Sequence, residues 1–189
     1  GGTKAMGNVA CEQGQVLYIS LEEGDTLFQA KLNHQAQGRP LPKDLEVFFE
    51  WPRMDEGGLD RLEIWLSARK RARAVFIDIW AKFQPQRQRD QNVYEGDYIA
   101  LAPLKALAQK YHVALFIVHH ENKLGMISGS SAMSGAPDTL LTWKRTNPEV
   151  RGVLAMEGRQ IEGRELIIEY NKETSQLINL GEAGSLRVS

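Results

Sequence analysis

Three short apolar segments constrain the fold of this chain more than any other feature of its sequence. Residues 16–21 (VLYISL), 74–79 (AVFIDI) and 113–118 (VALFIV) are almost continuously apolar and rich in β-branched and aromatic residues. Runs of this kind are typical of parallel strands that are buried on both faces. Helical patterns lie between them, and this alternation predicts an α/β fold with the three strands in the centre of a parallel sheet.

The segments between these strands predict the helices that cover the sheet. Apolar residues recur at helical spacing in residues 25–34 and 59–71. In the second segment they share one face: Leu59, Leu62, Trp65 and Leu66. A third helix is expected over residues 97–111, with Pro103 either in its first turns or at a bend. A weaker strand is expected at residues 45–49.

The pattern changes after Ser128, where a stretch of small residues is followed by short strands joined by turns. These strands are expected at residues 139–144, 152–156, 165–170 and 176–180. They predict an antiparallel extension on the edge of the parallel sheet. The polar segment at residues 84–92 (QPQRQRDQN) is expected to be a mobile loop.

The balance of charges excludes a chain-wide attraction to polyanions. Lys and Arg number 23 and Asp and Glu number 24, which gives a net charge of -1. Any contact with nucleic acid must therefore be local. The single cysteine, Cys11, excludes an internal disulfide, and no apolar run is long enough to cross a membrane. These features predict a cytoplasmic protein with no membrane partner.

Polar or charged residues stand at the ends of all three predicted central strands. Glu22 and Glu23 follow the first, Asp78 lies near the end of the second, and His119 and His120 follow the third. In an open parallel sheet, ligands bind outside the carboxyl ends of the strands. We therefore expect these side chains to face one crevice.

Each of these residues has a functional and a structural interpretation. Burying a carboxylate such as that of Asp78 is costly unless its charge is paired, and a hydrated Mg²⁺ beside a nucleotide would pair it, as would a neighbouring loop. Glu22 could deprotonate a water for attack on a terminal phosphate, or it could stabilise the N-terminus of the next helix, which suits Glu23 better. His119 and His120 lack the further ligands of a tetrahedral zinc site, so His120 is the candidate donor to a γ-phosphate.

Taken in order, four motifs resemble the RecA-like core of the hexameric replicative helicases of plasmids and phages, and most of all the RepA-type subgroup. They are LEEG, FIDIWAKF, VHHENK and SGSSAMSGAPDTLLTWKR, and the resemblance covers about residues 15–170. It implies a mainly parallel RecA-like sheet flanked by helices with an antiparallel C-terminal extension, and ATP and Mg²⁺ as cofactors. It also implies that Glu22 is the catalytic base, Asp78 binds Mg²⁺ beside the nucleotide and His120 senses the γ-phosphate.

The same resemblance implies that residues 122–136 face a central channel through which single-stranded DNA passes. The residues suited to contact phosphate there are Lys123, Ser128, Gly129, Ser130 and Ser131. Without the resemblance, a stretch rich in Gly and Ser is typical of a flexible connection.

RecA-like rings complete each ATP site with a basic residue of the neighbouring subunit, and the resemblance implies such a homo-oligomer, a hexamer in the parent protein. Arg159 stands where the family places this arginine finger. Three other residues compete for the role: Lys144, Arg145 and Arg151. Each could instead be a solvated charge of a hairpin. A separate cluster before the second strand is interpreted as structural: Arg69, Lys70, Arg71 and Arg73.

The phosphate-binding loop of such ATPases, GxxxxGKS or GxxxxGKT, does not occur in this sequence. The first strand and its P-loop helix are therefore expected to be missing from the chain, through truncation or natural loss. We divide it into an N-terminal segment (1–14), a partial ATPase core (15–180) and a tail (181–189), and expect it to be inactive alone.

The expected function of the parent protein is ATP-driven DNA unwinding or translocation. Two alternatives stay open. One is a non-catalytic RecA-like module that binds DNA or sister subunits. The other is a metal-dependent hydrolase that uses Asp78 and the two adjacent histidines.

Overall fold

A computed structural model describes residues 4–86, 92–120, 131–147 and 151–184, and the chain divides into two compact units. The first unit is built mainly from residues 12–28 and 42–136, and the second mainly from residues 2–11, 29–41 and 137–189. Within the described residues, no helix combines the length and the apolar character needed to cross a membrane.

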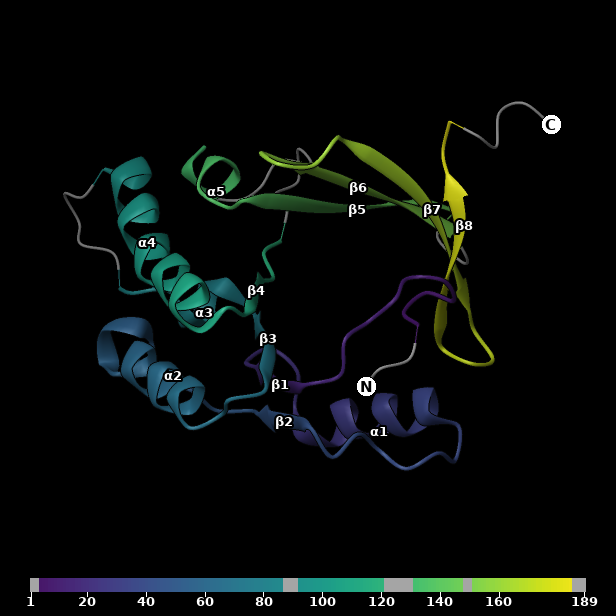
Figure 1. Ribbon diagram of the computed structural model, residues 1–189, viewed down its shortest axis with the longest axis horizontal. Helices are drawn as coiled ribbons and strands as arrows, with labels where there is room; N and C mark the ends of the chain where they lie inside the picture. Colours follow the sequence, from purple (N-terminus) through teal and green to yellow (C-terminus); the bar gives the residue numbers. More distant parts are fainter. Residues whose placement is uncertain (1–3, 87–91, 121–130, 148–150, 185–189) are drawn as a thin grey trace. The chain divides into compact units, whose positions relative to one another are not determined.

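The first unit is built around a parallel four-stranded sheet in the order β2-β1-β3-β4 (Figure 1). Its strands are β1 (Gln15–Ser20), β2 (Leu45–Phe48), β3 (Ala72–Asp78) and β4 (Ala114–Ile117). The helices are α1 (Asp25–Ala36), which continues into the second unit, η1 (Met54–Glu56), α2 (Gly58–Ser67), α3 (Trp80–Phe83), α4 (Val93–Tyr111) and α5 (Ala132–Gly135).

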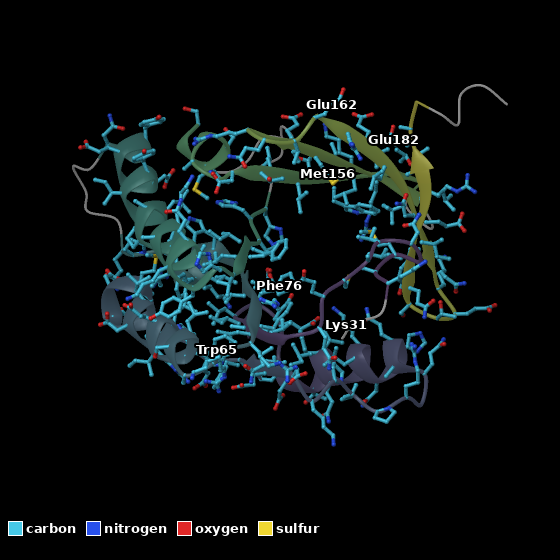
Figure 2. All side chains as sticks on the ribbon, viewed as in Figure 1. Lys31, Trp65, Phe76, Met156, Glu162 and Glu182 are labelled. Carbon is cyan, nitrogen blue, oxygen red and sulfur yellow. The ribbon has the colours of Figure 1, made fainter. Side chains whose placement is uncertain are left out.

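One face of this sheet forms the core, because alternate residues of β1 and β3 point into it. The sheet contributes four side chains with no exposed surface: Leu17, Ile19, Val75 and Ile77. The helices α2, α3 and α4 cover this face (Figure 1). The predicted apolar face of α2 is confirmed, since Leu62, Trp65 (labelled in Figure 2) and Leu66 are buried in the same cluster.

The opposite face carries a row of aromatic rings. Tyr18 of β1 stacks on Phe76 of β3 with 5.6 Å between ring centroids, and Phe76 stacks on Phe116 of β4 at 4.5 Å. Phe28 of α1 packs against Tyr18 at 5.0 Å. These rings are half-buried or exposed, so this face is less covered than the core face.

The third predicted strand does not lie in the centre of the sheet. Among the described strands, β4 pairs only with β3 and forms an edge. None of its residues is buried, and Ala114 and Phe116 are exposed. The prediction was wrong because a continuous apolar run indicates a strand but not which neighbours it has.

Two predicted helix boundaries also differ from the structure. The helix α4 begins at Val93, where the Asn92 side chain caps it by accepting a hydrogen bond from the Tyr94 N–H at 2.9 Å. Pro103 therefore lies inside the helix and not in its first turns. The helix α2 ends at Ser67, short of the predicted residue 71, and the Ala68 N–H closes its last turn on the Ile64 carbonyl. Of the predicted loop, residues 87–91 lie outside the described residues.

The second unit contains an antiparallel four-stranded sheet in the order β5-β6-β7-β8. Its strands are β5 (Thr139–Asn147), β6 (Arg151–Gly158), β7 (Arg164–Asn171) and β8 (Gln176–Glu182). The predicted antiparallel strands are confirmed, but they form a sheet of their own instead of extending the parallel one. Each strand pairs with the next along the chain, as short connections favour. Gly152 permits this packing, since a Cβ there would lie 2.5 Å from the Trp143 ring.

Three arginines of the basic cluster at the start of β3 have acidic partners, which agrees with the structural role that the sequence predicts. Its arginines form ion pairs within the first unit: Arg69 with Glu46 at 2.6 Å, Arg71 with Asp44 at 3.5 Å and Arg73 with Glu12 at 3.4 Å.

Candidate active site at the carboxyl edge of the parallel sheet

Glu22, Asp78 and His120, the three residues predicted to act on the nucleotide, lie at the carboxyl ends of three adjacent parallel strands. Ser20, the last residue of β1, is paired with Asp78, the last residue of β3. Glu22 follows β1 by two residues, and His120 follows β4, which pairs with the other side of β3. The common direction of the strands brings all three residues to one edge of the sheet.

Glu22 and His120 are in direct contact although 98 residues separate them in the sequence. The Nε2 atom of His120 lies 3.1 Å from Oε2 of Glu22. The Glu22 side chain is 53% exposed to solvent and the His120 side chain is 65% exposed, so both can reach a ligand or a water. The predicted base and the predicted sensor thus share a hydrogen bond.

Asp78 is held by a residue that the sequence analysis missed. The hydroxyl of Tyr18 donates a hydrogen bond of 2.7 Å to Oδ2 of Asp78. Burial raises the pKa of the Tyr18 hydroxyl, and the hydrogen bond to Asp78 raises it further, so the hydroxyl stays protonated and remains a donor. Strand alternation was the available signal, because Tyr18 and Asp78 lie on the same face once β1 and β3 are paired.

The turn that carries Glu22 is tied to the segment after β3. The N–H of Leu21 donates to the carbonyl of Asp78, and the ammonium of Lys82 donates to the carbonyl of Leu21 at 2.6 Å. The hydroxyl of Ser20 donates to the carbonyl of Glu23 at 3.1 Å. Lys82 is a second residue that the sequence analysis missed; it lies in the quoted motif FIDIWAKF, which carries a basic residue on the helix after Asp78.

The donor set suits a cation that takes few ligands from protein. Asp78 offers a carboxylate, and Mg²⁺ is usually bound by one or two carboxylates together with water and substrate phosphates. Nowhere in the described part of the chain do three His, Cys, Asp or Glu residues gather in a way that could hold a metal ion.

The other predicted site residues belong to the second unit, precede α5 or fall outside the described residues. Arg159 belongs to the second unit, directly after β6, and its N–H donates to the Asp138 carbonyl at 3.1 Å. Of its competitors, Arg151 pairs with Glu169 at 2.9 Å. Ser131 precedes the short helix α5. The carbonyl oxygen of Ser131 accepts a hydrogen bond from the Ser134 hydroxyl. The remaining predicted DNA contacts lie outside the described residues: Lys123, Ser128, Gly129 and Ser130.

Comparison with known families decides the classification. Residues 1–126 match the family described as AAA domain. The chain belongs to the AAA domain family. None of the curated proteins matches it significantly.

Solved structures place this AAA domain chain among RecA-like folds. An ATPase domain of known structure is 12% identical with a TM-score of 0.66, over 89% of this chain and 75% of that one. A DnaB-like replicative helicase, solved for its interactions with primase, is 13% identical with a TM-score of 0.65, and 89% of this chain covers 52% of it. The RadB recombinase is 14% identical with a TM-score of 0.59, over 89% of this chain and 80% of that one. The predicted RecA-like fold is confirmed.

Proposed function

We propose that this chain supplies part of the catalytic core of an ATP-driven DNA helicase or translocase. The observation that carries the proposal is the meeting of Glu22 and His120, at 3.1 Å, on the sheet edge where Asp78 ends β3. Membership of the AAA domain family supports it, as does a fold shared with an ATPase domain and a replicative helicase.

In this proposal the chain's residues divide the work of phosphoryl transfer to water. Glu22 takes a proton from the attacking water at a carboxylate oxygen, and its exposure leaves room for that water. His120 donates a hydrogen bond to the terminal phosphate from the nitrogen that now contacts Glu22. A bound terminal phosphate then replaces Glu22 as the hydrogen-bond partner of His120, and this frees the Glu22 carboxylate to act on the water.

Asp78 holds Mg²⁺ beside the nucleotide in this proposal. When bound, Mg²⁺ would neutralise charge on the phosphate oxygens. The sequence contains no GxxxxGKS or GxxxxGKT pattern, so the residues assigned to the nucleotide here are those of the sheet edge alone.

The finer parts of the proposal come from the family resemblance of the sequence. They are a homo-oligomeric ring, a hexamer in the parent, and contact of residues 122–136 with single-stranded DNA. Arg159 would act as a finger toward the neighbouring subunit. A cytoplasmic location completes the proposal, because the single cysteine offers no structural disulfide.

A second candidate is a non-catalytic RecA-like module that binds DNA or sister subunits. The observation that favours it is the missing phosphate-binding pattern, without which an ATPase of this class cannot cradle the triphosphate.

The experiment measures Mg²⁺-dependent ATP turnover of the full-length parent protein and of its Glu22→Gln variant. We expect turnover to fall by at least about a hundredfold, the usual cost of losing a general base. The matched control is Glu23→Gln, which changes the neighbouring carboxylate and should keep turnover. Unchanged turnover in Glu22→Gln removes Glu22 from the base role. No turnover in the unmodified full-length protein favours the non-catalytic module.

A further inference from the structure

The hydroxyl of Tyr18 is held beside Asp78 by a hydrogen bond and by the packing of its ring. It donates at 2.7 Å to Oδ2, and the Tyr18 ring is fixed by two others. One is Phe76, stacked at 18° with centroids 5.6 Å apart, and the other is Phe28, tilted at 56° and 5.0 Å away. Phe76, labelled in Figure 2, is itself stacked on Phe116 at 4.5 Å.

The backbone adds to this constraint. The β1 and β3 strands are paired in register, Tyr18 with Phe76 and Ser20 with Asp78, and the Leu21 N–H bonds the Asp78 carbonyl. The phenol and the carboxylate therefore project from the same face of adjacent strands, and neither strand can slide without breaking ladder hydrogen bonds.

We propose that Tyr18 is a positioning residue that orients the Asp78 carboxylate for a divalent cation. The inference rests on the proposed function, which assigns the cation to Asp78. The hydrogen bond uses one carboxylate oxygen and leaves the other for the metal. Hydrogen bonds from outer residues hold metal ligands in the binding orientation, and their loss weakens metal binding by about ten- to a hundredfold.

Tyr18→Phe tests the proposal because it removes the hydroxyl and keeps the ring in the aromatic row. The probe is Mn²⁺ alone, added to the full chain as a paramagnetic substitute for Mg²⁺. We measure Mn²⁺ binding from the broadening that it causes in the amide NMR signals of Leu21 and Ile79, two residues that flank the site. We expect the Mn²⁺ concentration at half-broadening to rise about tenfold in Tyr18→Phe.

The matched control is Tyr98→Phe, on α4, where the tyrosine is 54% exposed. It loses the same hydroxyl and should leave the midpoint unchanged. A second variant, Phe76→Leu, keeps the hydroxyl but loosens its support, and should raise the midpoint by a smaller factor. A role confined to folding would change the thermal midpoint of Tyr18→Phe without moving its Mn²⁺ midpoint.

The outcomes separate this inference from the proposed function. An unchanged Mn²⁺ midpoint in a folded Tyr18→Phe protein overturns the positioning role, while Asp78 can still be the ligand. Asp78→Asn should abolish the broadening near Leu21 and Ile79. If broadening persists in Asp78→Asn, the cation assignment of the proposed function fails, and the role of Tyr18 fails with it.

Discussion

A carboxylate held by two side chains joins β2 to the end of α2, and removing its charge should destabilise the first unit. Arg69 grips Glu46 with two hydrogen bonds, Nε to Oε1 at 2.7 Å and Nη2 to Oε2 at 2.6 Å. The indole N–H of Trp65 donates to Oε2 at 3.1 Å. Glu46→Gln keeps the shape of this side chain but loses its charge and one acceptor.

The size of the effect follows from the geometry and the exposure of the pair. Exposed ion pairs contribute about 0.2–1 kcal/mol, whereas hydrogen bonds to charged groups contribute about 1.5–3 kcal/mol. The Arg69 and Glu46 side chains retain 26% and 36% of their exposure, so water screens part of the gain. We therefore expect Glu46→Gln to lower the free energy of unfolding by about 1 kcal/mol at pH 7.

The effect should depend on pH with a defined sign. The hydrogen bonds from Arg69 hold the pKa of Glu46 below its ordinary value, against the opposing effect of burial. Because the pKa of Glu46 is lower in the folded protein than in the unfolded chain, the ionised carboxylate stabilises the fold at any pH above the unfolded-state pKa of about 4.3. This stabilisation is lost as the pH falls through the folded-state pKa. The difference between the wild-type and variant curves should therefore begin to shrink below about pH 4 and disappear at lower pH, once Glu46 is protonated in the folded state.

Urea unfolding followed by tryptophan fluorescence measures both effects. A loss of about 1 kcal/mol corresponds to a midpoint lower by about 0.5 M. The control is Glu63→Gln. Oε1 of Glu63 accepts from the Lys110 ammonium at 2.6 Å and from the Tyr111 hydroxyl at 3.3 Å, but the ion pair lies between more exposed side chains and has no bidentate arginine, so this variant should cost less. An equal loss in both variants, or a Glu46→Gln effect that is the same at pH 3 and pH 7, would refute the reasoning.

Two other predictions concern the core and residues 122–136, which are proposed to contact DNA. Leu62→Ala should cost about 2–5 kcal/mol because Leu62 has no exposed surface, whereas Ile64→Ala on the same helix should cost under about 0.5 kcal/mol because Ile64 is 68% exposed; similar urea midpoints for the two variants would contradict the packing of α2. In the full-length parent protein, Lys123→Ala should weaken binding to single-stranded DNA and reduce the salt slope by about one, as fluorescence anisotropy at several salt concentrations would reveal; an unaltered slope would return residues 122–136 to the role of a connection.

Much of the local structure follows from the pattern of residues along the chain. Apolar runs with β-branched residues predict strands, and those at residues 16–21 and 74–79 are central in the sheet. The spacing of Leu62, Trp65 and Leu66 predicts the buried face of α2, because helical periodicity is a property of the chain itself. Polar residues at strand ends could be assigned to one site for a similar reason, since parallel strands all end at the same edge.

Helix boundaries follow less directly from residue spacing than the helices themselves. Pro103 suggested a late start for α4, yet the Asn92 cap and the packing of Ala100, Leu101 and Leu104 favour a helix that runs through the proline. Tertiary packing outweighed the local preference here, as it often does.

The sequence alone determined where the strands and the three longer helices lie, apart from some of their boundaries, and which polar side chains stand at strand ends, because these features depend on residue spacing of a few positions. The tertiary structure decided which strands are neighbours, and so placed β4 at an edge and gave β5 to β8 a sheet of their own. It also decided that Tyr18 contacts Asp78 and that Glu22 contacts His120. These partners lie 60 and 98 residues apart, and only the register of paired strands brings such distant side chains within hydrogen-bonding distance.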